Sequence, residues 1–167
     1  MGGVRVLAVD GPSGAGKSTL AAQVVAGLRA RGCRTELVST DAFATWDDPV
    51  GWWPRLVEGV LRPLAAGLPG AYRQMDWTTG VPRPGELVRV AVPEVLVLEG
   101  VSSGRTSVRP LLSHLCWVGG GSAAERLARA VARDGAAARA ELGRWQRFER
   151  GWFAVDGTPG AAGTRLS

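Results

Sequence analysis

The sequence predicts one α/β domain built on a parallel β-sheet. Two short apolar runs, Val4–Val9 and Val95–Leu98, are rich in valine and leucine and have the composition of strands that are buried on both faces. Helix-forming sequence follows the first run, and the second run ends in an acidic residue. A chain of 167 residues is long enough for one such domain over residues 1–167, and no internal repeat or linker divides it.

The segment between the first strand and the first helix, Gly11–Ser18, fits the phosphate-binding pattern G-x-x-x-x-G-K-[S/T]. Glycines let the backbone N–H groups of such a loop surround a phosphate, and the following helix directs its positive end to the same place. We expect Lys17 to reach the outer phosphates of ATP or GTP and the Ser18 hydroxyl to bind Mg²⁺. The expected nucleotide-binding residues are Gly11, Ser13, Gly14, Ala15, Gly16, Lys17, Ser18 and Thr19.

The alternative is a glycine-rich turn that arose by chance in a chain with 24 glycines. Lys17 argues against it, because this residue is the only lysine beside 19 arginines. A chain that uses arginine elsewhere keeps lysine where a compact, flexible ammonium group is needed.

Composition narrows the classes of function. The chain has no run of 18 uncharged apolar residues, so we expect no membrane span, and its start shows no signal peptide. Two cysteines without a C-x-x-C pair and a single histidine argue against a zinc site or disulfides, and favour a cytoplasmic location. The net charge of +5 is compatible with nucleic-acid binding, but the arginines form no basic run. Polynucleotide binding is therefore the weaker interpretation.

Hydrophobic spacing predicts the remaining elements. Further strands are expected at 35–39, 115–118 and 164–167, and helices at 17–31, 54–67, 109–112, 122–134 and 136–152. Ser122 with Glu125 three residues later is the pattern of a capping box. Residues 44–92 are expected to form an insertion on the side of the site where a phosphate acceptor would bind. Its parts are an aromatic connector at 44–53, a loop-like stretch at 68–85 and a strand of an antiparallel pair at 86–92.

Three carboxylates stand at or near the ends of predicted strands. Asp41 follows the second strand, and ligands bind at the carboxyl ends of the strands in an open parallel sheet. Asp41 is therefore the best candidate for the general base that accepts the proton of an acceptor hydroxyl, with helix capping or a water-mediated Mg²⁺ contact as alternatives. Glu99 could belong to the metal shell or orient the acceptor, or face solvent. Asp10 could orient the loop amides or the metal shell, or be structural.

Arg126, Arg129 and Arg133 have the spacing of one helix face within residues 122–135. Beside a triphosphate, three arginines would neutralise the charge that develops during phosphoryl transfer, as a lid that closes over the nucleotide. The alternative is an ordinary solvated helix face.

The insertion supplies candidate groups for the acceptor. Several of its tryptophans lie in irregular segments and could stack on a base or line a pocket. Two of its aspartates could bind sugar hydroxyls, or could be ordinary turn residues. The expected acceptor-binding residues are Asp41, Phe43, Asp48, Trp53, Asp76, Trp77 and Glu99.

The order of these motifs resembles the uridine kinase-like family of phosphate-loop nucleoside kinases over about residues 4–152. The motifs are Gly11–Ser18, Ser39-Thr40-Asp41-Ala42-Phe43, Asp48-Pro49, Met75-Asp76-Trp77, Leu98-Glu99-Gly100 and Arg126 through Arg133-Asp134. The resemblance implies the three-layer fold of phosphate-loop NTPases, with a five-stranded parallel sheet, helices on both faces and a small antiparallel insertion. It also implies transfer of the γ-phosphate of ATP or GTP, with Mg²⁺, to a nucleoside 5′-hydroxyl.

Where the motifs match, the resemblance implies a role for each residue. Asp41 would be the base, and Asp48 and Asp76 would contact the acceptor sugar. Glu99 would belong to the metal shell, and the lid arginines would bind phosphates. The chain has Ala44 and Met75 where the family usually has tyrosine. These departures leave the acceptor open between a nucleoside and another small alcohol, such as a sugar, a vitamin or an antibiotic. A phosphate-loop ATPase or GTPase switch with a protein partner is the other alternative, and assembly into a homo-oligomer stays open.

Overall fold

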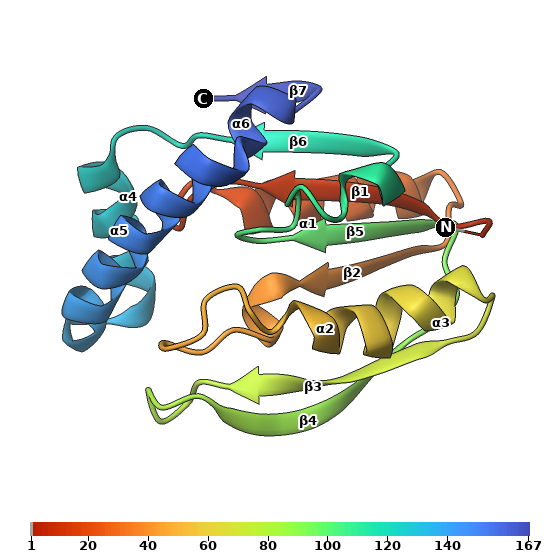
Figure 1. Ribbon diagram of the computed structural model, residues 1–167, viewed down its shortest axis with the longest axis horizontal. Coiled ribbons are helices and arrows are strands. Elements are labelled where there is room, and N and C mark those ends of the chain that lie inside the picture. Colours follow the sequence, from red (N-terminus) through yellow and green to blue (C-terminus); the bar gives the residue numbers. More distant parts are fainter. Residues whose placement is uncertain (1) are drawn as a thin grey trace.

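A five-stranded parallel sheet forms the centre of the protein in the computed structural model, which describes residues 2–167 (Figure 1). The strands lie in the order β2-β5-β1-β6-β7, and every neighbouring pair is parallel. Their bounds are β1 (Arg5–Asp10), β2 (Thr35–Ser39), β5 (Val95–Glu99), β6 (His114–Val118) and β7 (Thr164–Leu166). The predicted parallel sheet is confirmed, including the short strand expected near the end of the chain.

The strand register places the functional segments at one edge of the sheet. Val9 and Ser39 both pair with Glu99, so β1, β2 and β5 end side by side. Val6, Ala8 and Val9 are completely buried, as expected for a strand covered on both faces. The loops that follow these three strands therefore converge.

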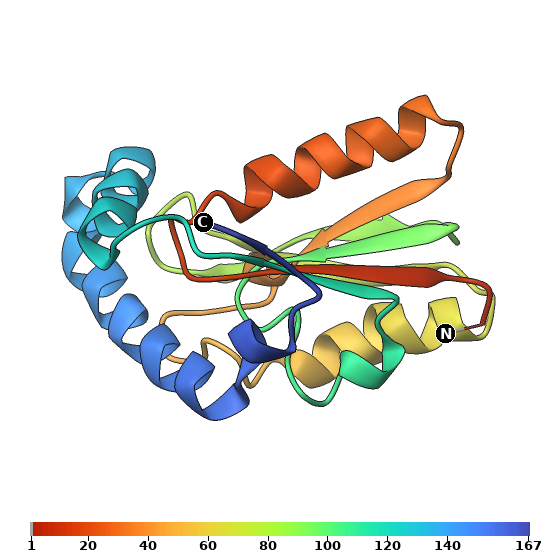
Figure 2. The ribbon, with the colours of Figure 1, turned by 90° about the horizontal axis from the view of Figure 1, so that it is seen from above.

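Helices cover both faces of the sheet (Figure 2). On one face lies α1 (Lys17–Ala30), and on the other lie α5 (Arg139–Asp156), α6 (Thr158–Ala161) and a continuous helical run made of α2 (Trp53–Leu56), the π-helical turn η2 (Val57–Leu61) and α3 (Arg62–Ala65). This run corresponds to the helix expected at 54–67. No helix within residues 2–167 has the length and apolarity needed to span a membrane.

The insertion contains a longer hairpin than the sequence indicated. The stretch 68–85 was expected to be a loop because it is rich in glycine and proline, but β3 (Gly70–Asp76) pairs antiparallel with β4 (Arg83–Val90). That expectation is wrong because a two-stranded hairpin has two free edges, and proline is tolerated at an edge. Pro84 pairs with Met75 next to a register shift between Arg73 and Met75.

Two helices form the end of the molecule at the left of Figure 1. Ser122 caps α4 (Ala123–Asp134) in the expected capping box with Glu125. The helix expected at 136–152 differs: a 3₁₀ turn η4 (Ala136–Ala138) comes first, and α5 extends to Asp156. Its buried stripe continues to Phe153, and Gly157 ends the helix in the left-handed conformation. Two further 3₁₀ turns, η1 (Thr40–Ala42) and η3 (Arg109–Leu111), complete the elements.

Candidate functional site

The phosphate loop connects β1 to α1, which is the strand–loop–helix context that its motif requires. Two of its glycines are irreplaceable on steric grounds, because a Cβ on Gly11 would lie 2.2 Å from the Val118 carbonyl oxygen and a Cβ on Gly14 2.2 Å from that of Arg126. The Lys17 side chain is buried in the loop, where its Nζ donates to the Pro12 carbonyl oxygen at 3.1 Å.

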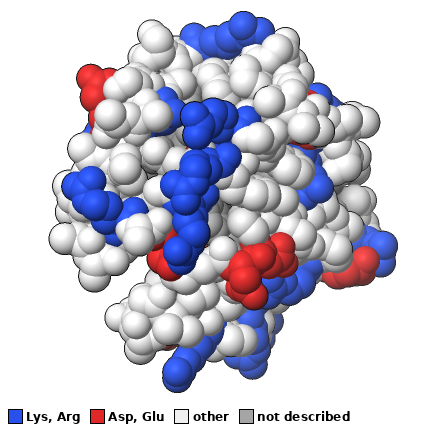
Figure 3. Space-filling view, turned by 60° about the vertical axis from the view of Figure 1, so that its left-hand side comes forward, with Lys and Arg blue, Asp and Glu red and all other residues white. Residues whose placement is uncertain are grey.

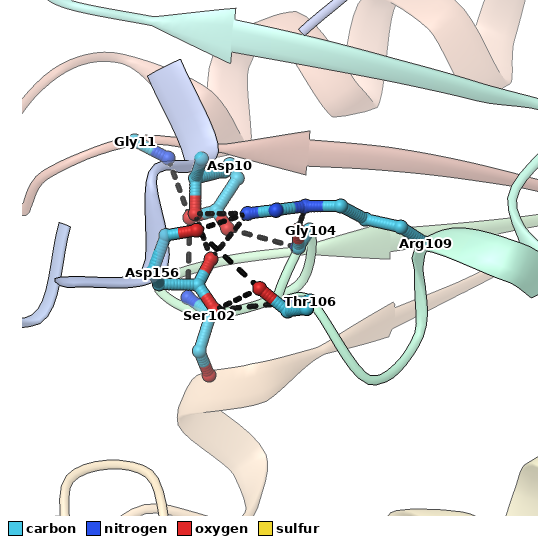
Figure 4. A network of polar contacts seen from close by, with 8 residues as sticks. Asp10, Gly11, Ser102, Gly104, Thr106, Arg109 and Asp156 are labelled. Carbon is cyan, nitrogen blue, oxygen red and sulfur yellow. Dashed lines mark hydrogen bonds and ion pairs between the residues drawn. The ribbon is translucent and has the colours of Figure 1, made fainter. Parts of the chain in front are cut away.

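The Asp10 carboxylate holds the start of the phosphate loop in place (Figure 4). Its carboxylate is fully buried and accepts three backbone N–H bonds, from Gly11 at 2.7 Å, Ser102 at 3.1 Å and Gly104 at 2.8 Å. Burial raises the pKa of Asp10 to about 7, although these N–H groups and the Lys17 charge act in the opposite direction. Asp10 therefore orients a loop amide, one of the roles that the sequence left open, and it joins the loop to the segment after β5.

The same network continues to the end of α5 (Figure 4). Arg109 donates to the Gly104 carbonyl oxygen at 2.9 Å and forms an ion pair with Asp156. Thr106 donates to Asp156 from both its backbone N–H and its hydroxyl. The segment that binds Asp10 is thus itself held against α5, and nothing in the sequence pattern indicated this pairing.

Ser18 and Glu99 meet at the edge of the sheet beside the loop. The Ser18 hydroxyl donates to Glu99 at 3.0 Å. Burial raises the pKa of the Glu99 carboxyl, and the negative charge of nearby Asp41 raises it further. Mg²⁺ prefers oxygen ligands, and nucleotide sites bind it through one or two protein groups together with phosphates.

This pair of oxygen donors fits such an ion. The described residues 2–167 contain no cluster of three or more His, Cys, Asp or Glu side chains that could hold a metal. A metal that relies on phosphates and water for its other ligands is therefore the kind that suits this position.

A cleft of about 380 Å³ opens between the phosphate loop, η1, the tip of the hairpin and the facing ends of α4 and α5. Asp41 is exposed and lies in its wall. Trp46 contacts two other tryptophans edge-on, Trp77 with ring centroids 4.9 Å apart and Trp145 at 5.8 Å. The lining residues are Ser13, Asp41, Ala44, Trp46, Trp77, Gly80, Arg133, Asp134, Ala138, Leu142 and Trp145.

Other residues expected to bind the acceptor are not among those that line this cleft. Phe43 is buried in the core, stacked on Trp52 at 5.3 Å, and Trp53 faces the Arg105 guanidinium at 5.1 Å. Asp48 accepts from the Gly51 N–H at 2.6 Å, a turn contact.

Asp76 is exposed at the end of β3, where it accepts from the Thr78 N–H at 2.9 Å. The structure therefore brings Asp41 and Trp77 together in the cleft and places Glu99 beside Ser18. The remaining expected residues have structural contacts within the protein: Phe43, Asp48, Trp53 and Asp76.

The three arginines of α4 have different partners. Arg129 donates to the Gly14 carbonyl oxygen at 2.8 Å and also to Gly120, so it joins α4 to the phosphate loop. Arg126 donates to Gly119 and Gly121 in the turn before the helix.

Arg133 lies in the cleft wall and pairs with the Asp134 carboxylate at 2.6 and 2.7 Å. α5 carries four exposed arginines, Arg139, Arg144, Arg147 and Arg150. Basic side chains are prominent on the side of the molecule drawn in Figure 3.

Sequence reasoning missed Trp145 and Glu149. Both are buried on α5, one turn apart on the same face. The signal in the sequence was a glutamate at helical spacing within the apolar stripe that continues from Leu142 to Phe153, a position where a charged residue needs a partner.

No protein-family model matches the chain, and no curated protein matches its sequence. Comparison with solved structures does find similar folds. The structure described as a "possible uridine kinase" from Bacillus stearothermophilus matches with a TM-score of 0.70 and 18% identity, over 100% of this chain and 90% of that one. The structure described as a "putative fructose transport system kinase" from Silicibacter sp. TM1040 matches with a TM-score of 0.66 and 24% identity, over 90% of this chain and 86% of that one.

At these identities the similarity shows the fold. The protein has the α/β fold of phosphate-loop kinases, with a five-stranded parallel sheet and an antiparallel hairpin. The fold class expected from the sequence is confirmed.

Proposed function

We propose that the protein is a kinase that transfers the γ-phosphate of ATP or GTP to a hydroxyl group of a small, nucleoside-like molecule. The observation that carries this proposal is the composition of the 380 Å³ cleft, which is lined by the phosphate-loop residue Ser13, the Asp41 carboxylate and three indole rings. Phosphoryl transfer requires donor and acceptor in one site, with a carboxylate beside the acceptor hydroxyl.

The donor side of the site would be formed by groups around the loop. The loop N–H groups and Lys17 would bind the phosphates, and Arg133, which lines the same cleft as Ser13, would neutralise charge on the transferred group. Ser18 and Glu99 would hold Mg²⁺, which supplies charge neutralisation at the phosphates when it is bound.

Asp41 would act as the general base. As the acceptor oxygen attacks the γ-phosphorus, its proton would pass to the Asp41 carboxylate, and the bond between the γ-phosphorus and the β–γ bridging oxygen would break to release ADP or GDP. The exposed position of Asp41 at the end of β2 lets an acceptor reach it, and the tryptophans around the cleft would exclude water from the other side.

The aromatic walls favour an acceptor with a flat ring. Trp46, Trp77 and Trp145 line the cleft, and a nucleobase could stack on an indole ring there. The two similar structures carry the descriptions "possible uridine kinase" and "putative fructose transport system kinase", so pyrimidine nucleosides and ketose sugars belong first in the set of acceptors to be tested.

The test is a coupled assay of ADP release with ATP and Mg²⁺ across nucleosides, sugars and vitamin alcohols. We expect turnover that depends on one class of acceptor. Asp41→Asn should lower kcat by about 10²–10⁴-fold, the usual contribution of a general base, while ATP binding measured by calorimetry stays near that of the wild type.

Asp47→Asn, which removes an exposed carboxylate six residues further along, is the matched control and should retain activity. Hydrolysis of ATP or GTP at the same rate with and without every acceptor would contradict the kinase proposal and favour a nucleotide switch.

A further inference from the structure

Glu149 makes a direct contact with the phosphate loop that no role discussed so far requires. Its side chain is 1% exposed, and its two carboxylate oxygens accept from the Ser13 N–H at 3.1 and 3.0 Å. The Ser13 hydroxyl donates to the same carboxylate. Glu149 therefore holds the loop residue that lies in the wall of the cleft.

The contact is unusual in its charge balance. None of the ion pairs found within residues 2–167 includes Glu149, and Lys17 donates instead to the Pro12 carbonyl oxygen. Burying a carboxylate without an ion pair is unfavourable unless hydrogen bonds compensate for it. Here the Ser13 donors of the phosphate loop compensate, together with the nearby positive charge of Lys17, so the position of the carboxylate and the shape of the loop depend on each other.

Glu149 is also connected to the acceptor side of the cleft. Trp145 lies one helical turn earlier on the same buried face of α5, and it lines the cleft. Burial raises the pKa of Glu149, and the hydrogen bonds from Ser13 and the charge of Lys17 act in the opposite direction. On the other side, Glu149 borders a second cavity of about 640 Å³ that also touches Pro12 of the loop.

We propose that Glu149 is a positioning residue for phosphoryl transfer, which holds Ser13 and the first half of the phosphate loop in register with the Trp145 wall of the cleft. Through this contact, α5 carries both the acceptor wall and the support of the donor loop. The proposal rests on the function proposed above for its catalytic consequence, but the support of the loop is a separate property that can be measured without turnover.

The test uses inorganic tripolyphosphate with Mg²⁺ as a probe of the loop, titrated by calorimetry into the full chain. Glu149→Ala leaves both Ser13 donors without their partner, and the probe should bind about tenfold more weakly or worse, because the loop loses the charge-assisted hydrogen bonds that hold it in place. Glu149→Gln keeps an acceptor oxygen for Ser13 and should restore affinity to within about threefold of the wild type.

Glu141→Ala, on the same helix but outside the cleft, is the matched control and should bind the probe as the wild type does. Thermal unfolding of each variant verifies that it is folded. If Glu149→Ala does not fold, Ser13→Ala removes only the hydroxyl donor, and a weaker loss of affinity is then expected.

Equal or tighter binding by Glu149→Ala would overturn the proposal, because the carboxylate would then compete with phosphate and not support its site. An equal loss in the Gln and Ala variants would also overturn it, because the acceptor oxygen would then be irrelevant. Once an acceptor is known, the Ala variant should raise KM for the donor and lower kcat, and Gln should reverse both. If the protein has no kinase activity, these kinetics are absent in the wild type as well, while the tripolyphosphate result stands.

Discussion

Replacing Asp10 should change the way in which the stability of the protein depends on pH. The pKa of Asp10 is about 7 in the folded protein, against an ordinary value of 3.8. Because the folded pKa is raised, the folded protein retains a proton that the unfolded chain releases above pH 4. The contribution of this group to the free energy of unfolding is therefore highest below pH 4 and is lost as pH rises through 7.

The size of this loss follows from the two pKa values. One pKa unit corresponds to ~1.4 kcal/mol, so the difference corresponds to about 4 kcal/mol between pH 4 and pH 8. Asp10→Asn cannot ionise and lacks this change. Its amide nitrogen also faces one of the N–H donors that now bind Asp10, and the lost hydrogen bond should destabilise the variant by about 1–3 kcal/mol at low pH.

The assay is urea denaturation of both proteins at intervals from pH 4 to pH 8. The difference in unfolding free energy should move by about 4 kcal/mol in favour of Asp10→Asn as pH rises. Burial also raises the pKa of Glu99 and Glu149, but both residues are present in the two proteins and cancel in the difference. Glu86→Gln, an exposed carboxylate, is the control. Parallel pH curves for the wild type and Asp10→Asn would refute the reasoning.

Two further predictions concern the loop and the cleft. Gly14→Ala places a Cβ 2.2 Å from the Arg126 carbonyl oxygen, at a residue whose φ is 74°, so α4 must shift. Nucleotide affinity measured by calorimetry should therefore fall by about tenfold or more. An affinity equal to that of the wild type would contradict this contact. Trp46→Ala removes the edge contacts with Trp77 and Trp145, so KM for the acceptor should rise by about tenfold while KM for ATP stays unchanged; an equal rise in both constants would show that the cleft is not specific to the acceptor.

The parts of the fold that could be predicted from the sequence are those with local signals. The phosphate loop, the apolar strand Val95–Leu98 and the capping box of Ser122 each consist of residues that are close in sequence, and each occurs as expected. The hairpin was only partly predicted, because glycine and proline indicate a loop as readily as a free strand edge at Pro84.

The supports of the site could not be predicted for the opposite reason. Ser13 and Glu149 are 136 residues apart in the sequence. The Gly104 N–H that donates to Asp10 is 94 residues from it in the sequence. A carboxylate in an apolar stripe indicates that some partner exists, but its identity depends on the tertiary packing of α5 against the loop. Asp48 and Asp76 were ambiguous for a different reason. Their carboxylates accept hydrogen bonds within their own turns, and an aspartate that does this has the same sequence pattern as one that binds a ligand.

The tryptophan arrangement of the cleft has an optical consequence. Trp46, Trp77 and Trp145 lie in three different segments: the connector at 44–53, the hairpin turn and α5. Indole rings at such separations couple their electronic transitions, and the sign and strength of the resulting near-ultraviolet circular dichroism depend on the angles between the rings, 81° and 85° here. A molecule that entered between them, or a rotation of α5 relative to the hairpin, would change that spectrum, so the cleft contains its own unlabelled reporter of occupancy.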